Sequence, residues 1–326
     1  MTMPEVVLVE ANPALLFKGV NDPGFDGAPI REVDPYGKHL SVFDLGFIRG
    51  DGIFEATSVV GGVPLAMKLH IARLGRSARL QDLPELTGEQ EWLDVCQAAI
   101  DLWGQPEETG TIRLLISRGA DPVTTVGQAG HPGTPTIFIF VDTVRTPRPL
   151  TLTGTLLTRG YSLELVRTAP ERHPWLLIGA KTLSYTANMA TYREAVRRGA
   201  DFGIYTSTDG YVLEGGTSSL VLMKDGKLTT PIPDVGILHG TTQQEVFAYA
   251  ERRGVPHEYA FVTVEELLDA DFVWNMGGSR LSAVERIDDV SFAADTEFAA
   301  QAMAFFETER AYIEEYTTGP GIQRWL

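Results

Sequence analysis

The chain has 326 residues, of which 44% are hydrophobic and 21% are charged, and both fractions are typical of a globular protein. Lys and Arg number 27 against 43 Asp and Glu, so the formal net charge is −16. Because this charge repels polyanions and no basic stripe offsets it, we expect neither nucleic acid nor an anionic membrane as a partner. A small anion can still bind in a local pocket, since salt screens the field of the whole protein over about 10 Å.

Cysteine content and hydropathy narrow the class of protein further. Cys96, the single cysteine, lies in an apolar helical pattern with Trp92 and Val95, which predicts a buried structural thiol. One cysteine allows no internal disulfide and no cysteine-based metal cage, and we predict no metal site. No apolar run approaches the roughly 18 residues of a membrane span, and no leader pattern opens the sequence. We therefore expect a cytoplasmic protein.

Length and composition along the chain predict two domains. Residues 1–38 are irregular and rich in Pro and Gly, which indicates an N-terminal extension packed on the body or on a partner subunit. A small α/β domain is expected over 39–144. The segment 143–149 carries two prolines among polar residues and is the candidate linker to a larger domain over 145–326.

Periodicity predicts the elements of the first domain. Alternation over 52–61 indicates a strand that ends at the hairpin signal Gly61-Gly62, with a return strand over 63–68. A helix over 88–103 is expected to start from a cap at Thr87. The remaining expected elements are a helix over 69–80, strands over 111–117 and 136–141, and a polar loop over 119–135 that is long enough to form a lid or rim.

The second domain again mixes helices and hairpins. Thr263 and Glu266 form a capping-box signal, and Gly254 is a typical helix stop. The expected helices cover 186–198, 242–253 and 295–316, and the expected strands cover 203–207, 211–213, 220–223, 227–230 and 271–275. Because hairpin turns recur between alternating elements, the sequence predicts an α/β (α+β) fold with mixed or antiparallel sheets and flanking helices.

Lys181 is the first candidate for chemistry. It follows a small-residue turn and stands among apolar neighbours in the segment 178–188. Partial burial would favour the neutral amine that Schiff-base chemistry needs. Taken alone, the pattern also fits an ordinary surface lysine.

Three further segments could bind an anionic aromatic cofactor. Glu214 ends an apolar strand before two glycines and could face a ring nitrogen, although it also fits a solvated strand end. Thr241 and Thr242 follow Gly240 at a helix start, where backbone N–H groups and the helix dipole favour a phosphate, although an ordinary cap fits too. The Gly-rich turn in 275–280 could add donors or be only a turn. His239 receives no role.

The order and spacing of these segments resemble the fold type IV pyridoxal 5′-phosphate (PLP) family. That family contains branched-chain aminotransferases, D-amino acid transaminases, (R)-amine transaminases and aminodeoxychorismate lyases. The resemblance runs from about Asp44 to Asp288. It includes Arg49-Gly-Asp-Gly-Ile-Phe-Glu55, His70-Ile-Ala-Arg-Leu-Gly-Arg-Ser-Ala78, Ala180-Lys-Thr-Leu, Gly210-Tyr-Val-Leu-Glu214 and Ile237-Leu-His-Gly-Thr-Thr242.

The resemblance implies a role for each matching residue. Lys181 would form the internal aldimine and shuttle the proton between Cα and C4′, and Glu214 would pair with the pyridinium nitrogen. Leu238 would lie against the ring, and Tyr185 would approach the phenolate oxygen. The phosphate would be bound by Arg73, Thr241, Thr242, Gly277, Gly278 and Ser279, where relatives often carry hydroxyl residues in place of the two glycines.

The family's substrates imply weaker assignments. Phe54 would line the substrate pocket, and Arg49 and Arg118 are candidate anchors for a substrate carboxylate, although each also fits a structural or surface residue. The loop 119–135 lacks the Arg-x-His pair of D-amino acid transaminases. Arg49-Gly-Asp51 replaces the His-Ser-Asp start of some (R)-amine transaminases.

The expected activity is transamination from an amino acid or amine, including D-amino acids or (R)-amines, to a 2-oxo acid. Two alternatives stay open: 4-amino-4-deoxychorismate lyase, which releases pyruvate and 4-aminobenzoate, and a branched-chain L-amino acid aminotransferase. The Ala-Lys-Thr-Leu-Ser-Tyr and His-Gly-Thr-Thr-Gln-Gln segments resemble lyase-like members. Family resemblance also implies a homodimer with PLP bound by the larger domain.

Overall fold

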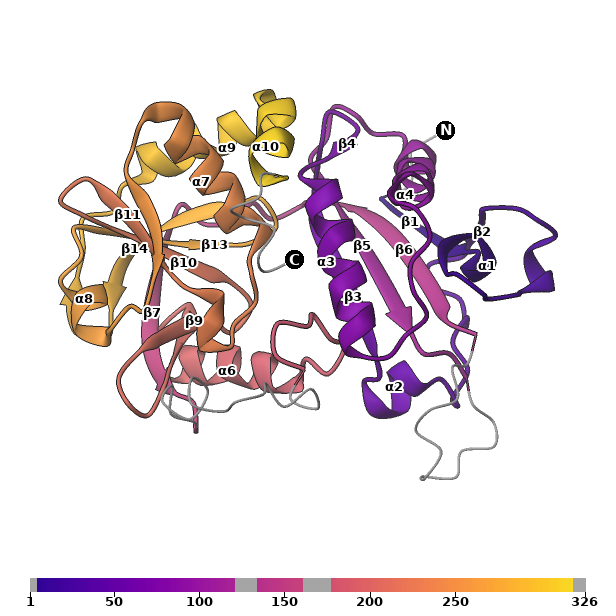
Figure 1. Cartoon of the computed structure of the whole chain (residues 1–326), viewed down its shortest axis with the longest axis horizontal. Helices are drawn as coiled ribbons and strands as arrows, with labels where there is room; N and C mark the ends of the chain where they lie inside the picture. The colour runs from indigo at the N-terminus through magenta and orange to yellow at the C-terminus, as the bar shows by residue number, and fades with distance from the viewer. Residues whose placement is uncertain (1–4, 121–133, 161–176, 319–326) are drawn as a thin grey trace. The chain divides into compact units, whose positions relative to one another are not determined.

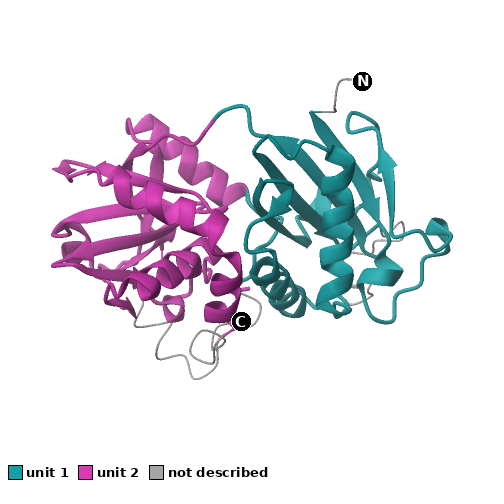
Figure 2. Cartoon of the chain, turned by 90° about the horizontal axis from the view of Figure 1, so that it is seen from above, with its two compact units in different colours: residues 1–146, 180–185 teal, residues 147–179, 186–326 magenta. Residues whose placement is uncertain are grey.

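The chain forms two compact units in a computed structural model that describes residues 5–120, 134–160 and 177–318. Unit 1 comprises residues 1–146 and 180–185, and unit 2 comprises residues 147–179 and 186–326 (Figure 2). The boundary after Thr146 falls within the segment 143–149 that the sequence marks as a linker. Most of the expected loop over 119–135 lies outside the described residues.

Unit 1 is built on a six-stranded antiparallel sheet with the order β2-β1-β6-β5-β3-β4 (Figure 1). Alternate residues of β5 and β6, such as Leu114 and Ile139, point into one apolar core. The strands are β1 (Val6–Ala11), β2 (Ile30–Val33), β3 (Gly52–Val60), β4 (Val63–Pro64), β5 (Gly110–Ser117) and β6 (Thr136–Thr143).

Two long helices cover this sheet. α3 (Met67–Leu80) packs against β3, and α4 (Glu89–Trp103) packs against β1 and β6. Cys96 of α4 is buried, as expected, and burial raises the pKa of its thiol. The shorter helices of unit 1 are α1 (Pro13–Leu16), η1 (Pro23–Phe25) and α2 (Leu45–Arg49).

The structure of unit 1 differs from the sequence expectation at three places. The expected extension over 1–38 contains β1, which pairs along its length with β6 and places Val7 and Val9 in the core. The return strand is only two residues long because Ala66 takes a left-handed conformation and α3 begins at once. Thr87 is not the cap of α4, since its hydroxyl donates to the carbonyl of Leu15 instead.

Unit 2 contains a mixed sheet with the order β12-β11-β10-β13-β14-β7-β8-β9, to which β15 adds beside β14. Strand pairs β11–β12, β14–β7 and β7–β8 are parallel and the others are antiparallel. The strands are β7 (Thr151–Thr158), β8 (Phe202–Thr206), β9 (Val212–Gly215), β10 (Ser219–Lys224), β11 (Lys227–Pro231), β12 (His257–Ala260), β13 (Phe272–Met276), β14 (Leu281–Ile287) and β15 (Val290–Ser291).

The helices of unit 2 include one wholly buried helix start. The first ten residues of α7 (Thr241–Arg253) are all buried, and the helix ends at Gly254 as expected. The capping box of Thr263 and Glu266 is confirmed at α8 (Val264–Leu268). The single helix expected over 295–316 is two helices, α9 (Thr296–Thr308) and α10 (Arg310–Thr317), which break at Glu309. α6 (Thr186–Arg197) and η3 (Pro233–Val235) complete the unit.

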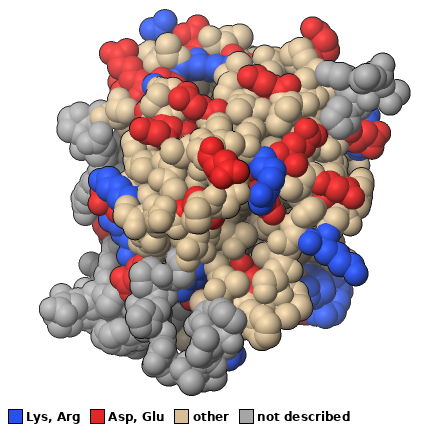
Figure 3. All heavy atoms as spheres, turned by 90° about the vertical axis from the view of Figure 1, so that its right-hand side faces the viewer, with Lys and Arg blue, Asp and Glu red and all other residues tan. Residues whose placement is uncertain are grey.

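These elements confirm the expected α/β architecture of mixed and antiparallel sheets with flanking helices. Within the described residues, no helix is both long and apolar enough to cross a membrane. The face drawn in Figure 3 shows acidic side chains scattered among uncharged ones, with basic side chains in small groups rather than in a stripe.

Candidate active site

The segment 180–185 carries Lys181 and belongs to unit 1, although the sequence assigned it to the larger domain. It runs beside the first half of β3 and is fixed there by backbone hydrogen bonds. The N–H of Phe54 donates to the carbonyl of Lys181 (3.0 Å), and the N–H of Leu183 donates to the carbonyl of Gly52 (2.8 Å). Lys181 is therefore held on a sheet, which positions it more firmly than a free loop would.

Two glycines of the Arg49-Gly-Asp-Gly motif explain how this segment approaches β3 so closely. A Cβ atom on Gly52 would lie 2.3 Å from the carbonyl oxygen of Ile116 in β5 and 2.6 Å from a methyl carbon of Leu183, so a side chain there would collide with both β5 and the lysine-bearing segment. Gly50 has a φ of +69°, and a Cβ atom there would lie 2.5 Å from Oγ of Ser184. The motif therefore has a structural consequence: it lets the lysine-bearing segment dock on unit 1.

Aromatic rings surround the Lys181 amine. Its Nζ lies 4.3 Å from the ring centroid of Phe54 and 5.4 Å from that of Tyr185. The two rings meet edge to face at 5.0 Å. On the main chain, the N–H of Lys181 donates to Oγ of Ser77 in α3 (3.0 Å). The backbone and the amine of Lys181 are thus both constrained within unit 1.

A buried ionic cluster joins β3 to α3. The carboxylate of Glu55 accepts hydrogen bonds from Nε and Nη2 of Arg73, both at 2.7 Å, in a two-pronged pair. Nδ1 of His70 lies 2.7 Å from the same carboxylate. All three side chains are almost completely buried. Because His70 and Arg73 are three residues apart on α3, they face β3 together.

The electrostatics of the cluster follow from its partners. Burial alone would raise the pKa of Glu55, but the charge and hydrogen bonds of Arg73 and His70 outweigh it and lower the pKa to about 2. Burial lowers the pKa of His70, so the ring is neutral and its Nδ1–H donates to Glu55. Nε2 of His70 is buried and has no hydrogen-bond partner in the described part of the chain.

The expected substrate residues of unit 1 lie in different surroundings. The guanidinium of Arg118 makes a two-pronged pair with Asp51 (2.8 and 3.0 Å) and also donates to the carbonyls of Gln81 and Asp82. The donors of the Arg118 guanidinium are therefore already bound to groups of the protein. Arg49 is exposed at the end of α2 and has no hydrogen bond or ion pair within the described residues.

Unit 2 carries the remaining expected residues. Glu214 lies in β9, and its Oε2 accepts a hydrogen bond from the N–H of Leu238 (3.2 Å). This contact brings the carboxylate together with the segment that leads into α7. Both side chains are half-buried, so they retain accessible surface.

The start of α7 combines buried hydroxyls with uncapped backbone. Gly240 is the N-cap and provides no side-chain cap, while Thr241 and Thr242 are buried. The N–H of Ser279 donates to Oγ1 of Thr242 (2.8 Å), so the 277–279 turn lies against the first turn of the helix. The structure thus brings together the start of α7 and the turn, two segments in which the sequence predicted anion-binding residues.

Three buried residues received no role of their own from the sequence, namely Glu55 and His70 in unit 1 and Glu245 in unit 2. Glu55 and His70 lie inside the motifs Arg49–Glu55 and His70–Ala78 of the family resemblance. The sequence did carry a signal for Glu55, because a glutamate on the buried side of an alternating strand needs a partner. Glu245 is buried in the second turn of α7, where its carboxyl oxygens lie 2.8 and 3.1 Å from Oγ of Ser279. Burial raises the pKa of Glu245 to about 8, against the smaller opposing effect of the Ser279 hydrogen bond.

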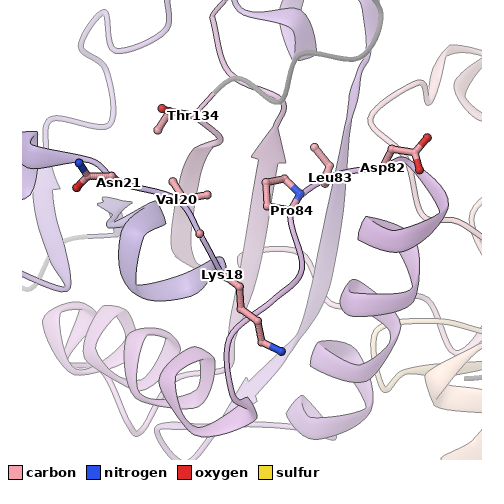
Figure 4. Close-up of a pocket in the computed structure, with 8 residues that line it drawn as sticks. Lys18, Val20, Asn21, Asp82, Leu83, Pro84 and Thr134 are labelled. Atoms are coloured by element: carbon pink, nitrogen blue, oxygen red, sulfur yellow. The ribbon is translucent and has the colours of Figure 1, made fainter.

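A separate cavity of about 370 Å³ lies in unit 1 and contains none of the expected site residues. Lys18, Val20, Leu83 and Pro84 are among the residues that line it, and the labelled side chains do not converge on one point (Figure 4). The Lys18 amine is paired with Glu85 (2.8 Å). Among the residues described, no cluster of three or more His, Cys, Asp or Glu side chains could hold a metal ion.

Comparison with known proteins identifies relatives over most of the chain. The model of the family described as amino-transferase class IV matches residues 52–287. A bifunctional aminodeoxychorismate lyase / D-amino acid transaminase from Mycobacterium tuberculosis is 37% identical over 256 residues, which cover 75% of this chain and 84% of that protein.

Solved structures agree with the sequence match. A fold IV-transaminase from Curtobacterium pusillum has a TM-score of 0.79 and 33% identity, and the match covers 94% of this chain and 98% of that one. The PLP-bound form of a hypothetical aminotransferase from Mycobacterium tuberculosis has a TM-score of 0.76 and 31% identity, with 93% and 99% covered.

Proposed function

The chain belongs to the class IV aminotransferase family, and on this premise we propose that it is a PLP enzyme that moves an amino group to a 2-oxo acid. The position of Lys181 is the observation that carries the proposal. Its backbone is fixed to β3 and to Ser77, and its amine lies between the rings of Phe54 and Tyr185. We propose that this amine carries the cofactor and then moves the proton at the substrate Cα.

Functional groups within each unit have the chemistry that parts of the cofactor require. When bound, PLP supplies an electron sink for the negative charge that develops at the substrate Cα. Glu214 is placed at a strand end with one oxygen oriented by Leu238, and we propose that it holds the ring-nitrogen proton while Leu238 lies against the ring. Tyr185, beside the Lys181 amine, is proposed to approach the phenolate oxygen.

A doubly charged phosphate needs several donors when it is removed from water. The uncapped start of α7, with the buried hydroxyls of Thr241 and Thr242, supports a phosphate seat there. Arg73 is proposed to supply positive charge to it. Because two nitrogens of the Arg73 guanidinium donate hydrogen bonds to Glu55, the orientation of the guanidinium is fixed before any ligand binds.

Cofactor binding is tested by absorbance. The purified protein is expected to show the band of lysine-bound PLP and to lose it in Lys181→Ala while its thermal stability stays within a few degrees. Lys227→Ala, an exposed lysine on β11 paired with Glu258, is the matched control and should keep the band. A wild-type protein that stays colourless after addition of PLP would overturn the proposal.

The substrate and the reaction type leave three candidates. The relative from Mycobacterium tuberculosis that combines aminodeoxychorismate lyase and D-amino acid transaminase activities supports both D-amino acids as donors and lyase chemistry. We propose transamination from a D-amino acid or (R)-amine as the main activity and the lyase as the second candidate. A relative described as a putative branched-chain-amino-acid aminotransferase is 28% identical and leaves L-leucine as a third donor to be tested.

A panel of half-reactions separates these candidates. D-alanine, an (R)-arylalkylamine and L-leucine would each convert the bound cofactor to its amine form in a single turnover if accepted. Aminodeoxychorismate would give 4-aminobenzoate and pyruvate over many turnovers without any 2-oxo acid if the lyase is present. Release of 4-aminobenzoate combined with no reaction of the three amines would contradict the transaminase assignment.

We also propose a homodimer. Exposed apolar side chains gather in and before α2, where Val42, Phe43 and Phe47 are 68%, 50% and 67% exposed. Such a surface on unit 1 favours contact with another protein surface. Light scattering after size exclusion should give twice the chain mass, and Phe47→Asp should shift the mass toward the monomer, whereas a monomeric wild-type protein would refute the dimer.

A further inference from the structure

Glu245 is a buried titratable group that the proposed chemistry does not use. It lies in the second turn of α7, is 1% exposed, and has Ser279 as its only hydrogen-bond partner in the described part of the chain. Glu245 forms no ion pair with any residue that the structure describes. Glu251, two turns later on the same helix, is exposed. A buried carboxyl without a cation is costly to ionise, so its surroundings favour the protonated form.

Glu245 and Thr242 together hold one residue of the turn. They are three positions apart and therefore lie on the same face of α7. Ser279 binds to that face twice, because its N–H donates to Oγ1 of Thr242 and its hydroxyl contacts both carboxyl oxygens of Glu245. Ser279 also has a φ of +57°, a left-handed conformation that a non-glycine residue adopts at a cost.

The other side of the turn is held by Arg148. Its Nη1 donates to the carbonyl of Gly277 (3.4 Å) and its Nε donates to Oγ of Ser282 (2.9 Å). The 277–279 turn is therefore fixed between Arg148 and the first two turns of α7. The hydroxyl of Ser279, which the sequence assigned to the cofactor phosphate, is engaged by Glu245.

We propose that Glu245 is a positioning residue that holds Ser279, and with it the 277–279 turn, against the start of α7 where the cofactor phosphate binds. Burial keeps the carboxyl protonated at neutral pH, as its raised pKa of about 8 indicates. A protonated carboxyl can accept a hydrogen bond from the Ser279 hydroxyl through its carbonyl oxygen, or donate one to it through its O–H. It also adds no negative charge beside the phosphate seat.

The inference rests on the proposed PLP binding, and its test has one readout that needs no cofactor. In the apo protein, Glu245→Leu should raise the amide exchange rate of the peptide that contains Ser279, because the leucine fills the volume but cannot bind the hydroxyl. Glu245→Gln should restore slow exchange, since its amide reproduces the donor and acceptor of the protonated carboxyl. Glu251→Leu is the matched control on the exposed face. Unchanged exchange in Glu245→Leu would overturn the proposal.

The second readout is the dissociation constant of PLP, measured by absorbance titration. Loss of one positioning hydrogen bond should weaken binding by about tenfold in Glu245→Leu and by little in Glu245→Gln. If Glu245 acts through Ser279, then Ser279→Ala should weaken binding equally, and the double variant should be no worse than either single one. A double variant whose losses add would instead mean that Ser279 contacts the phosphate directly and would refute the role given to Glu245.

These outcomes are distinguishable from failure of the proposed function. Absence of PLP binding in the wild-type protein would refute the cofactor assignment, whereas wild-type binding with an unaffected Glu245→Leu would refute only the positioning role. If Glu245→Leu does not fold, Ser279→Ala, which removes only a hydroxyl, must still show faster exchange and weaker binding.

Discussion

Each unit contains a glutamate that is almost completely buried, and the two are accommodated in opposite ways. Glu55 in unit 1 is surrounded by Arg73 and His70, which lower its pKa to about 2 and keep it ionised. Glu245 in unit 2 has only the hydroxyl of Ser279, and burial raises its pKa to about 8. Both side chains are 1% exposed, so the presence of a cation decides whether the side chain keeps its charge.

The two glutamates also orient their neighbours in different ways. In unit 1 the carboxylate is a fixed charge that orients the Arg73 guanidinium. In unit 2 an uncharged carboxyl orients a turn next to a proposed phosphate seat, where another negative charge would be unfavourable. The same amino acid thus orients a cation in unit 1 and a backbone turn in unit 2, in two different protonation states.

Removal of the cation from unit 1 should have the largest effect on stability. Arg73→Met would leave Glu55 buried without its main partner, and we expect a loss of roughly 3–5 kcal/mol in the free energy of unfolding. Urea unfolding of apo protein at pH 7.5 measures this loss without any contribution from the cofactor. Arg113→Met is the control, because its pair with Asp142 is 39% and 30% exposed and should contribute at most about 1 kcal/mol. Equal losses in the two variants would contradict the comparison.

Replacing Glu245 of unit 2 by an uncharged glutamine should instead stabilise the protein at alkaline pH. Because the folded pKa of Glu245 is raised from 4.5 to about 8, the unfolded state ionises first, and stability is lost as pH rises between those values. Glu245→Gln removes this loss. We expect it to match the wild type near pH 4.5 and to exceed it by on the order of 3 kcal/mol near pH 9.

The measurement for this variant is urea unfolding at several pH values, with Glu251→Gln as the exposed control on the same helix. Titration of other groups affects all three proteins alike. The difference in free energy of unfolding between Glu245→Gln and the wild type therefore reports the contribution of the Glu245 carboxyl alone. A Glu245→Gln variant that is less stable than the wild type at pH 9 would show that the carboxyl is ionised and paired.

The sequence predicts features that depend on nearby residues and misses those that depend on distant pairing. β3 with its turn at Gly61-Gly62, and α7 with its stop at Gly254, follow from local alternation and glycine signals. The attachment of Lys181 to unit 1 does not, because it depends on hydrogen bonds with Phe54, far earlier in the chain. The break at Glu309 carries neither Gly nor Pro and left no signal.

The candidate site shows the same division. The residue types at Lys181, Glu214 and Thr242 are recognisable from motif order, and the fold class and cofactor family follow from it. The protonation state of Glu245 could not be predicted, because every residue in the first ten positions of α7 is buried and amphipathic spacing therefore does not distinguish it. Its partner Ser279 lies in a turn more than thirty residues later in the sequence.

The smallest expected effect concerns His70, which tests how much the neutral histidine adds to the pair of Glu55 with Arg73. His70→Leu removes the hydrogen bond from Nδ1 to Glu55 but leaves Arg73 in place, so we expect a loss of about 1–2 kcal/mol at pH 7.5. The folded pKa of His70 is lowered from 6.5 by burial, so the wild-type protein loses stability as pH falls below 6.5, where the unfolded histidine takes up a proton. The variant has no histidine at this position and therefore does not show this loss. The difference in free energy of unfolding between the wild type and the variant, measured by urea unfolding, should therefore be smaller at pH 5.5 than at pH 7.5. A larger difference at pH 5.5 would mean that His70 is protonated in the folded state and acts as a second cation for Glu55.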